Sequence, residues 1–176
     1  MGNAAGAGGG GAVNIDVKVD TSQFDRILSD FPMAFERAKT QALKDIGAAV
    51  VSRATQAFRS PPMRPSPWAP RKKSYIVTVN KKTGKKTKQL DDHPLLIKSG
   101  ALRQSIFWFK VHGDDRVTIM SDKKYAKYHQ TGTKHMPARP FLPIDRDGKL
   151  VPQMQRKIEK IVEEAVAEEL GNIGIQ

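Results

Sequence analysis

The sequence predicts an α+β fold in which an antiparallel sheet of about four to five strands packs against a long N-terminal helix and a C-terminal helix. Three patterns predict it: apolar and polar residues alternate over 13–19, and apolar residues recur every three or four positions over 32–58 and again over 151–170. A period of two is that of a strand with one buried face, and a period near 3.6 is that of an amphipathic helix.

The composition limits the chain to one ordinary domain with appendages. It has 176 residues and no cysteine, which excludes disulfide scaffolds, thiolate metal sites and cysteine catalysis. No run of about 18 apolar residues occurs, so we expect no transmembrane helix and no membrane partner. The net charge of +12 is typical of a protein with an acidic partner, either nucleic acid or an acidic neighbour in a large assembly.

Residues 1–11, MGNAAGAGGGG, form a Gly/Ala-rich arm, and residues 12–176 form the single domain. After the first strand, Thr21 or Ser22 can cap a helix, with a kink or break at Pro32. The main helix is therefore predicted from Pro32 to Phe58. A helix this long exceeds what a small sheet covers, so we expect its far end to meet a neighbouring subunit.

A proline-rich loop and a basic hairpin follow the long helix. Residues 59–70, RSPPMRPSPWAP, contain five prolines and can be neither helix nor central strand, so Trp68 is expected to anchor this loop to the domain. Residues 71–90 are predicted to be an inserted hairpin, with strands 75–79 and 87–90 on either side of a turn around Gly84.

The hairpin is the strongest electrostatic feature of the sequence. It holds eight basic residues and no acidic one between positions 71 and 88, which is two-thirds of the net charge. Its tip has no aromatic residue among the lysines, so any nucleic-acid contact is expected to be with phosphates and without sequence preference. The alternatives are contact with an acidic neighbouring ring or a solvated loop. The candidate contact residues are Arg71, Lys72, Lys73, Lys81, Lys82, Lys85, Lys86 and Lys88.

The rest of the sheet is predicted from residues 99–121. Ser99 is expected to cap a short helix over 100–104, and strands 105–111 and 116–120 form a second hairpin. Apolar side chains occupy both faces of the first of these strands, since Phe107 and Phe109 alternate with Ile106 and Trp108. We therefore expect this strand to be covered by a helix on one side and by another chain or loop on the other. Pro152 suits the first turn of the last helix, and Gly171 suits its end.

The stretch 125–144, YAKYHQTGTKHMPARPFLPI, is the most informative part of the chain. It reads as a short helix ended by Gly132, followed by an extended segment fixed by three prolines. Proline gives no N–H to a ladder, so this segment is expected to be an edge strand or to lie beside one. Arg139 is expected at a subunit contact, and Phe141 and Leu142 are core residues or interface anchors. The interface candidates are Tyr125, His129, Arg139, Phe141 and Leu142.

No residue pattern indicates catalysis, a metal or a cofactor, and we expect none of the three. No histidine pair has the spacing of a zinc motif, and a site drawn from Asp122, His129 and His135 is less favoured than packed or surface histidines. The paired carboxylates at 91–92 and 114–115 lie where aspartate is favoured as a turn former. No phosphate-binding glycine loop and no G-x-S-x-G motif occurs.

The pattern YA-x-x-HQ-x-GT followed by PARPFLP resembles the phage virion-morphogenesis family, which contains the tail-completion and head–tail joining proteins of long-tailed bacteriophages. PLLIKSGALRQSI at 94–106 is similar to a second block of that family, and Trp68 is a weaker match. The resemblance spans roughly residues 20 to 170. It implies a structural protein of the virion neck, located at the head–tail junction and in the host cytoplasm during assembly.

The resemblance further implies a homo-oligomeric ring around the DNA channel, with sixfold symmetry favoured and twelvefold possible. Other neck and tail proteins, and DNA in the channel, would be its partners. The alternative function is a stand-alone, sequence-nonspecific DNA-binding protein that uses the lysine-rich hairpin. A small nuclease is a third and weaker reading, because no convincing metal cluster is present.

Overall fold

The computed structural model describes residues 14–18, 32–72, 75–91, 93–110, 115–145, 147–172 and 174. Their elements in chain order are β1 (Asn14–Lys18), α2 (Pro32–Ala57), the 3-10 turn η1 (Pro61–Met63), β2 (Tyr75–Val79), β3 (Lys86–Leu90), α3 (Ala101–Gln104), β4 (Ile106–Lys110), β5 (Arg116–Ser121), α4 (Ala126–Thr131) and α5 (Pro152–Asn172). The α+β class and the two long helices are confirmed. The glycine-rich arm, the helix expected before Pro32 and the 111–114 turn lie outside the described residues.

The strands form two separate antiparallel sheets. In the first, β5 lies between β1 and β4, and in the second, β2 pairs with β3. The main sheet therefore has three strands within the described residues, fewer than the four to five expected. The predicted hairpin is confirmed, but its side chains are all exposed because it packs on neither face of the main sheet.

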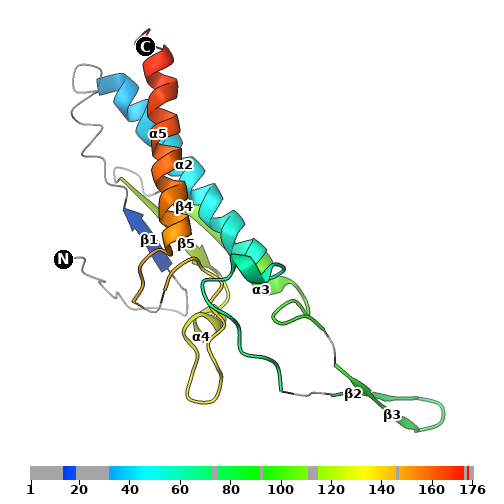
Figure 1. The fold of residues 1–176 in the computed structure, drawn as a ribbon. Helices are drawn as coiled ribbons and strands as arrows, with labels where there is room; N and C mark the ends of the chain where they lie inside the picture. Colours follow the sequence, from blue (N-terminus) through cyan, green and yellow to red (C-terminus); the bar gives the residue numbers. More distant parts are fainter. Residues whose placement is uncertain are drawn as a thin grey trace.

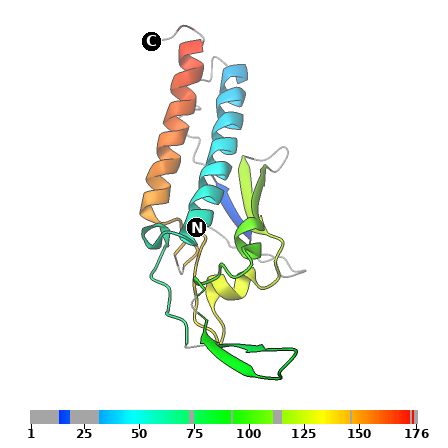
Figure 2. The same cartoon turned by 90° about the vertical axis from the view of Figure 1, so that its right-hand side faces the viewer.

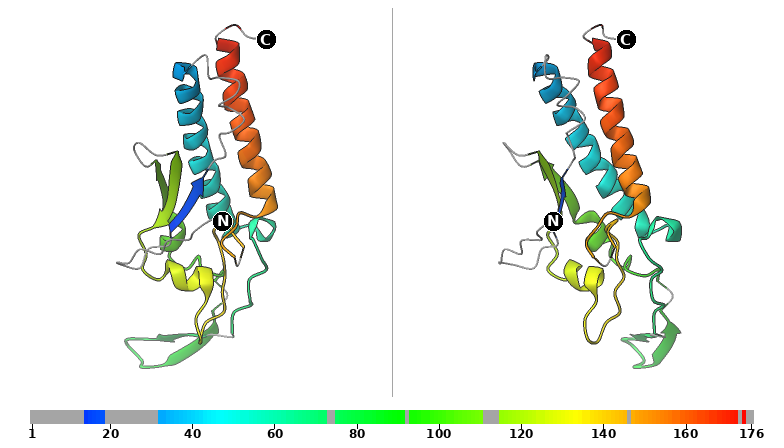
Figure 3. Two further views of the ribbon diagram at one scale, coloured as in Figure 1. Left: turned by 90° about the vertical axis from the view of Figure 1, so that its left-hand side faces the viewer. Right: turned by 60° about the vertical axis from the view of Figure 1, so that its left-hand side comes forward.

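Helix α2 is the centre of the molecule. It is covered by the sheet on one side and by α5 on the other (Figures 1 and 2), and the further views agree (Figure 3). Its buried residues are mostly small, which lets neighbouring elements approach closely: Ala34, Ala38, Ala42, Leu43, Ile46, Gly47, Ala49, Val50, Ala54 and Ala57. Helix α5 of the same chain thus packs along α2, and a contact of the far end of α2 with a neighbouring subunit stays a prediction.

Gly47 brings the sheet against the backbone of α2. A Cβ atom added there would lie 2.4 Å from Cδ2 of Trp108, so the indole occupies the space that any side chain would need. Glycine inside a helix costs about 1 kcal/mol relative to alanine. The close contact between β4 and α2 explains why this helix tolerates it.

Trp68 anchors the proline-rich loop, as predicted. It is 8% exposed, its Nε1 donates to the carbonyl oxygen of Pro140 at 2.7 Å, and its ring meets Phe58 edge-on at 5.8 Å between centroids. The guanidinium of Arg64 lies 4.0 Å above the indole. Phe58 in turn packs against Phe141, so the loop is tied to the main core.

The inner face of β4 is covered by a helix, as expected, and cover of its outer face by another chain or loop stays a prediction. Ile106 is buried and Trp108 half-buried, whereas Phe107 and Phe109 are 44% and 42% exposed. The inner face meets α2, and no described residue of the same chain buries the outer one. The N-cap of the short helix α3 is Gly100, whose φ of +71° suits glycine, and not Ser99 as expected; the Ser99 hydroxyl accepts from the Ala101 N–H at 3.3 Å.

Trp68→Ala should lower the free energy of unfolding by about 3–5 kcal/mol, because it removes a buried aromatic ring and leaves the Pro140 carbonyl without its donor. Thermal or urea denaturation measures the change. The exposed Met33→Ala is the control and should shift stability little. An unchanged midpoint for Trp68→Ala would show that the loop is not anchored by this residue.

Candidate functional site

Helix α4 ends against the proline segment that follows it. Gly132 has a φ of +78°, a backbone angle that residues with a side chain rarely adopt. A Cβ atom added there would lie 2.8 Å from the backbone nitrogen of Ala138. Conformation and close approach both require glycine at this position. The expected role of Gly132 in ending the helix is confirmed.

Residues 137–144, which we call the latch, form hydrogen bonds with the end of α4 and do not pair with a strand of either sheet. The Arg139 N–H donates to the carbonyl of His129 at 2.7 Å. The buried Gln130 accepts from the N–H groups of both Phe141 and Leu142 through Oε1, each at 3.1 Å. The segment is therefore not an edge strand, the first of the two alternatives expected, because a helix carbonyl and one side-chain amide supply the acceptors that a ladder would supply.

Arg139 holds the proline-rich loop of its own chain. Its Nε donates to the carbonyl of Ala69 at 3.0 Å and its Nη2 to that of Pro70 at 3.3 Å. Both of these hydrogen bonds are thus made within the chain. A contact with another subunit stays a prediction.

His129 lies beside this arginine and faces the aromatic ring of Tyr125, 5.8 Å away between ring centroids. Burial lowers the pKa of His129, and the positive charge of Arg139 lowers it further. The imidazole is therefore held neutral at neutral pH. Within the described residues its Nδ1 is buried without a hydrogen-bond partner.

The interface candidates divide into buried and exposed groups. Phe141 and Leu142 lie inside the core of the chain itself, at 1% and 2% exposure. Tyr125 is exposed, and so is Tyr128, which the sequence pattern did not single out. Tyr125, which precedes α4, and Tyr128 within it are thus the exposed aromatic residues of this region in the described part of the chain.

The basic hairpin presents most of its predicted contact residues to solvent. Lys81, Lys82, Lys85, Lys86 and Lys88 are exposed, as is Lys72. Lys88 also lies 4.3 Å above the ring of Tyr75. Lys73 lies outside the described residues.

Arg71 is engaged at the base of the hairpin. It forms an ion pair with Asp91 at 3.0 Å and lies within hydrogen-bonding reach of the Asp91 and Pro94 carbonyls. Among the predicted contact residues it therefore has a role in closing the hairpin, and a phosphate would have to compete with Asp91 for it.

The net positive charge of the chain comes from one stretch of the sequence. Residues 71–139 contain 17 basic and 5 acidic residues, which equals the whole net charge of +12, and the remaining residues contain 13 of each sign. The hairpin and α4 lie at one end of the molecule, and the C-terminal end of α5 lies at the other (Figure 1). The eight basic residues between positions 71 and 88 thus make the hairpin end of the molecule its basic end.

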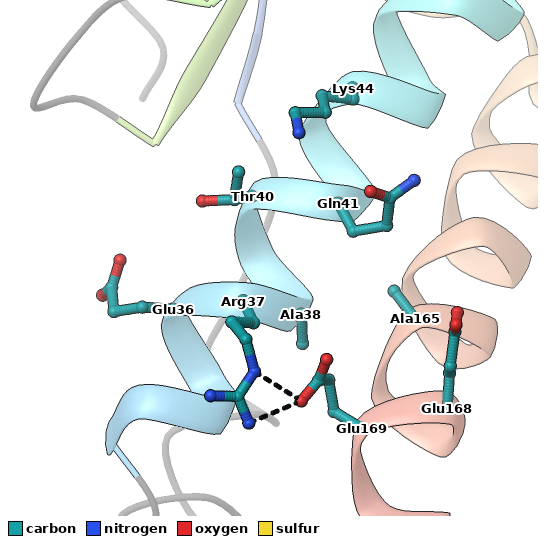
Figure 4. Close-up of a pocket in the computed structure, with 9 residues that line it drawn as sticks. All are labelled: Glu36, Arg37, Ala38, Thr40, Gln41, Lys44, Ala165, Glu168 and Glu169. Atoms are coloured by element: carbon teal, nitrogen blue, oxygen red, sulfur yellow. Dashed lines mark hydrogen bonds and ion pairs between the residues drawn. The ribbon is translucent and has the colours of Figure 1, made fainter. Parts of the chain in front are cut away.

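A groove lies between α2 and α5 (Figure 4). It is at the end of the helical pair that is far from the hairpin (Figure 1). Arg37 crosses it, with Nε and Nη2 each 3.0 Å from Oε2 of Glu169. The residues that line the groove include no nucleophile paired with a base. They are Glu36, Arg37, Ala38, Thr40, Gln41, Lys44, Ala165, Glu168 and Glu169. In the part of the chain that is described, no group of three or more histidines and carboxylates could hold a metal ion, and no helix is both long and apolar enough to span a membrane.

Arg139→Ala should loosen the proline-rich loop, because two carbonyl groups lose a charged donor. We expect stability to fall by about 1.5–3 kcal/mol, with faster proteolysis between residues 59 and 72. Arg139→Lys is the control, since one ammonium can keep part of the contact but cannot reproduce the planar fork. If Arg139→Ala has the melting temperature and the proteolysis rate of the parent, the two hydrogen bonds do not contribute to stability.

Comparison with known protein families finds a match to the phage virion morphogenesis family over residues 19–167. No curated protein and no solved structure matches the chain. The matched range covers α2, both hairpins, α4, the latch and most of α5, so it includes every contact described above that fixes α4 and the hairpin. Because the match extends over most of its length, the chain belongs to the phage virion morphogenesis family.

Proposed function

We propose that this chain is a structural protein of the phage neck that acts in tail completion or head–tail joining by forming a ring around the DNA channel. Membership of the virion morphogenesis family indicates the general role, which is a structural one in building the virion. The place in the neck and the ring are our proposal. Sixfold symmetry is favoured and twelvefold is possible.

The segregation of charge is the observation that carries this proposal. In a ring every copy has the same orientation relative to the axis, so the basic ends of all copies gather on one side of the assembly. Duplex DNA carries one phosphate for about every 1.7 Å of its axis, and a ring of lysines offers it many equivalent contacts. Such contacts need no base recognition, which suits a channel that must accept any sequence.

The lysines at the hairpin tip suit this role because they are long, exposed and unpaired with carboxylates. Within the described residues none of Lys81, Lys82 and Lys85 is within ion-pair distance of an acidic group. The turn that carries them is ordered locally by the Asn80 side chain, which accepts from the Lys82 and Thr83 N–H groups. An acidic surface of another neck or tail protein could also bind the lysines at this tip.

Changing Lys81, Lys82 and Lys85 together to glutamine should leave the fold intact, because all three side chains are exposed. DNA binding should weaken, and the magnitude of the slope of log affinity against log salt should fall by up to about 3. The matched control changes the exposed Lys44, Lys149 and Lys157 to glutamine, which removes the same charge outside the basic end. Equal effects of the two variants would mean that net charge, and not the hairpin, is responsible.

The same pair of variants separates the proposed role from the alternative. A stand-alone DNA-binding protein would lose nearly all of its affinity in the hairpin variant and would not be retained in purified virions. A neck protein would stay in the virion and lose efficiency in joining or in DNA retention.

Imaging of particles made without this chain tests the place in the neck. Filled heads separated from finished tails would support joining, and overlong tails would support termination of the tail. Mass measurement of the complete virion should give about six or twelve copies. One or two copies per particle would contradict the ring.

A further inference from the structure

The hairpin has an apolar strip on one face. Residues paired across an antiparallel ladder point to the same face, so Val77 and Val79 share that face with their partners Lys88 and Lys86. These four residues are called the hairpin strip. Val77 and Val79 are 55% and 48% exposed, and nothing in the described part of the chain covers them. A two-stranded hairpin with no packed face is marginally stable in water, so the strip requires a partner.

A stripe with two valines and two acidic residues runs along α5, from the edge of its contact with α2 to the exposed side next to it. Val162 and Val166 are only half-buried, because they lie at the edge of the side that α2 covers. Glu159 and Glu163 are exposed and follow the same helical spacing of three and four residues. These four residues are called the α5 stripe. Among the described residues neither glutamate has a basic partner.

We propose that the hairpin strip of one copy packs on the α5 stripe of a second copy. The strip offers two valines and two lysines, and the stripe offers two valines and two glutamates. Lysines two residues apart on a strand are separated by about 7 Å along it, and glutamates one turn apart on a helix by about 6 Å. Both pairs of opposite charges can therefore form at once in one row, while the valines meet in the row beside them.

The contact joins different copies because its two halves lie far apart in one chain. The hairpin lies at one end of the molecule, and α5 runs away from it toward the opposite end (Figures 1 and 3). Two unlike surfaces that bind each other make a head-to-tail interface, which closes into a ring when the rotation between copies allows it. The inference rests on the proposed ring and names the surfaces that build it.

In this arrangement the lysines of the hairpin have two different roles. Lys86 and Lys88 face the neighbouring copy, whereas Lys81, Lys82 and Lys85 belong to the turn and remain free for phosphate. DNA alone would satisfy the lysines but would leave the valines exposed. A second copy satisfies both kinds of residue.

Charge reversal tests the proposal. Lys86→Glu with Lys88→Glu should raise the dissociation constant of the oligomer by about tenfold or more, and so should Glu159→Lys with Glu163→Lys. Combining all four changes should restore assembly, because the pairs form again with opposite sign. Glu164→Lys with Glu168→Lys is the control, since these glutamates lie on a different side of α5 and should have little effect. Light scattering over a range of concentrations measures the molar mass.

Cross-linking tests the same contact without changing charge. The chain has no cysteine, so Val79→Cys and Val166→Cys introduce single thiols. Mixing the two variants under mild oxidation should give a covalent dimer, and either variant alone should not. Glu164→Cys replaces Val166→Cys in the control mixture, which should remain uncross-linked.

The outcomes separate this inference from the proposed function. A parent protein that is monomeric in solution and present in one or two copies per virion would overturn both. A parent ring that survives both charge reversals, or that is not restored by the combination, would overturn only the docking. Loss of DNA binding in Lys86→Glu with Lys88→Glu, with no change in oligomer mass, would assign these lysines to DNA.

Discussion

The structure depends on α2 being covered on two opposite sides by two different kinds of element. Small side chains make this possible: Gly47 admits the indole of Trp108 on the sheet side, and alanines admit α5 on the other. The two long-range contacts at the ends of the helical pair, Arg37 with Glu169 and Arg53 with Gln153, fix the register of α5 along α2. A larger residue at Gly47 would separate the sheet from the helix and open the core.

The core in turn fixes the root of the hairpin through a chain of contacts. Phe58 at the end of α2 packs on Phe141 and Trp68, and Trp68 donates to the latch. Arg139 of the latch holds Ala69 and Pro70, the residues directly before the hairpin. The loop that precedes the hairpin is therefore anchored to the core, although the strands of the hairpin contact only each other.

Local patterns predicted the helices and the hairpin because each depends on residues close together in sequence. The anchoring role of Trp68 was predicted from its residue type in a proline-rich loop, although its hydrogen-bond acceptor is the distant Pro140. The latch could not be predicted in this way. Its prolines correctly excluded a central strand, but the acceptor for its N–H groups is the side chain of Gln130, and nothing in the sequence distinguishes this glutamine from a surface one. Likewise, the alternation in β4 showed two apolar faces, but whether a second layer exists depends on chains other than this one. The role of Gly47 required knowing which tryptophan faces it.

The position of α5 in the chain has a consequence for the order of biosynthesis. Arg37 and Glu169 are separated by 132 positions, and closing a loop of that length comes late in folding. On the ribosome, α2 emerges long before the helix that covers its second side, so its alanine face stays open to water until residues 152–172 have been made. Until then, Val162 and Val166 do not exist as a surface. The proposed contact between the hairpin of one copy and α5 of another therefore requires that the receiving chain has already been translated through this helix.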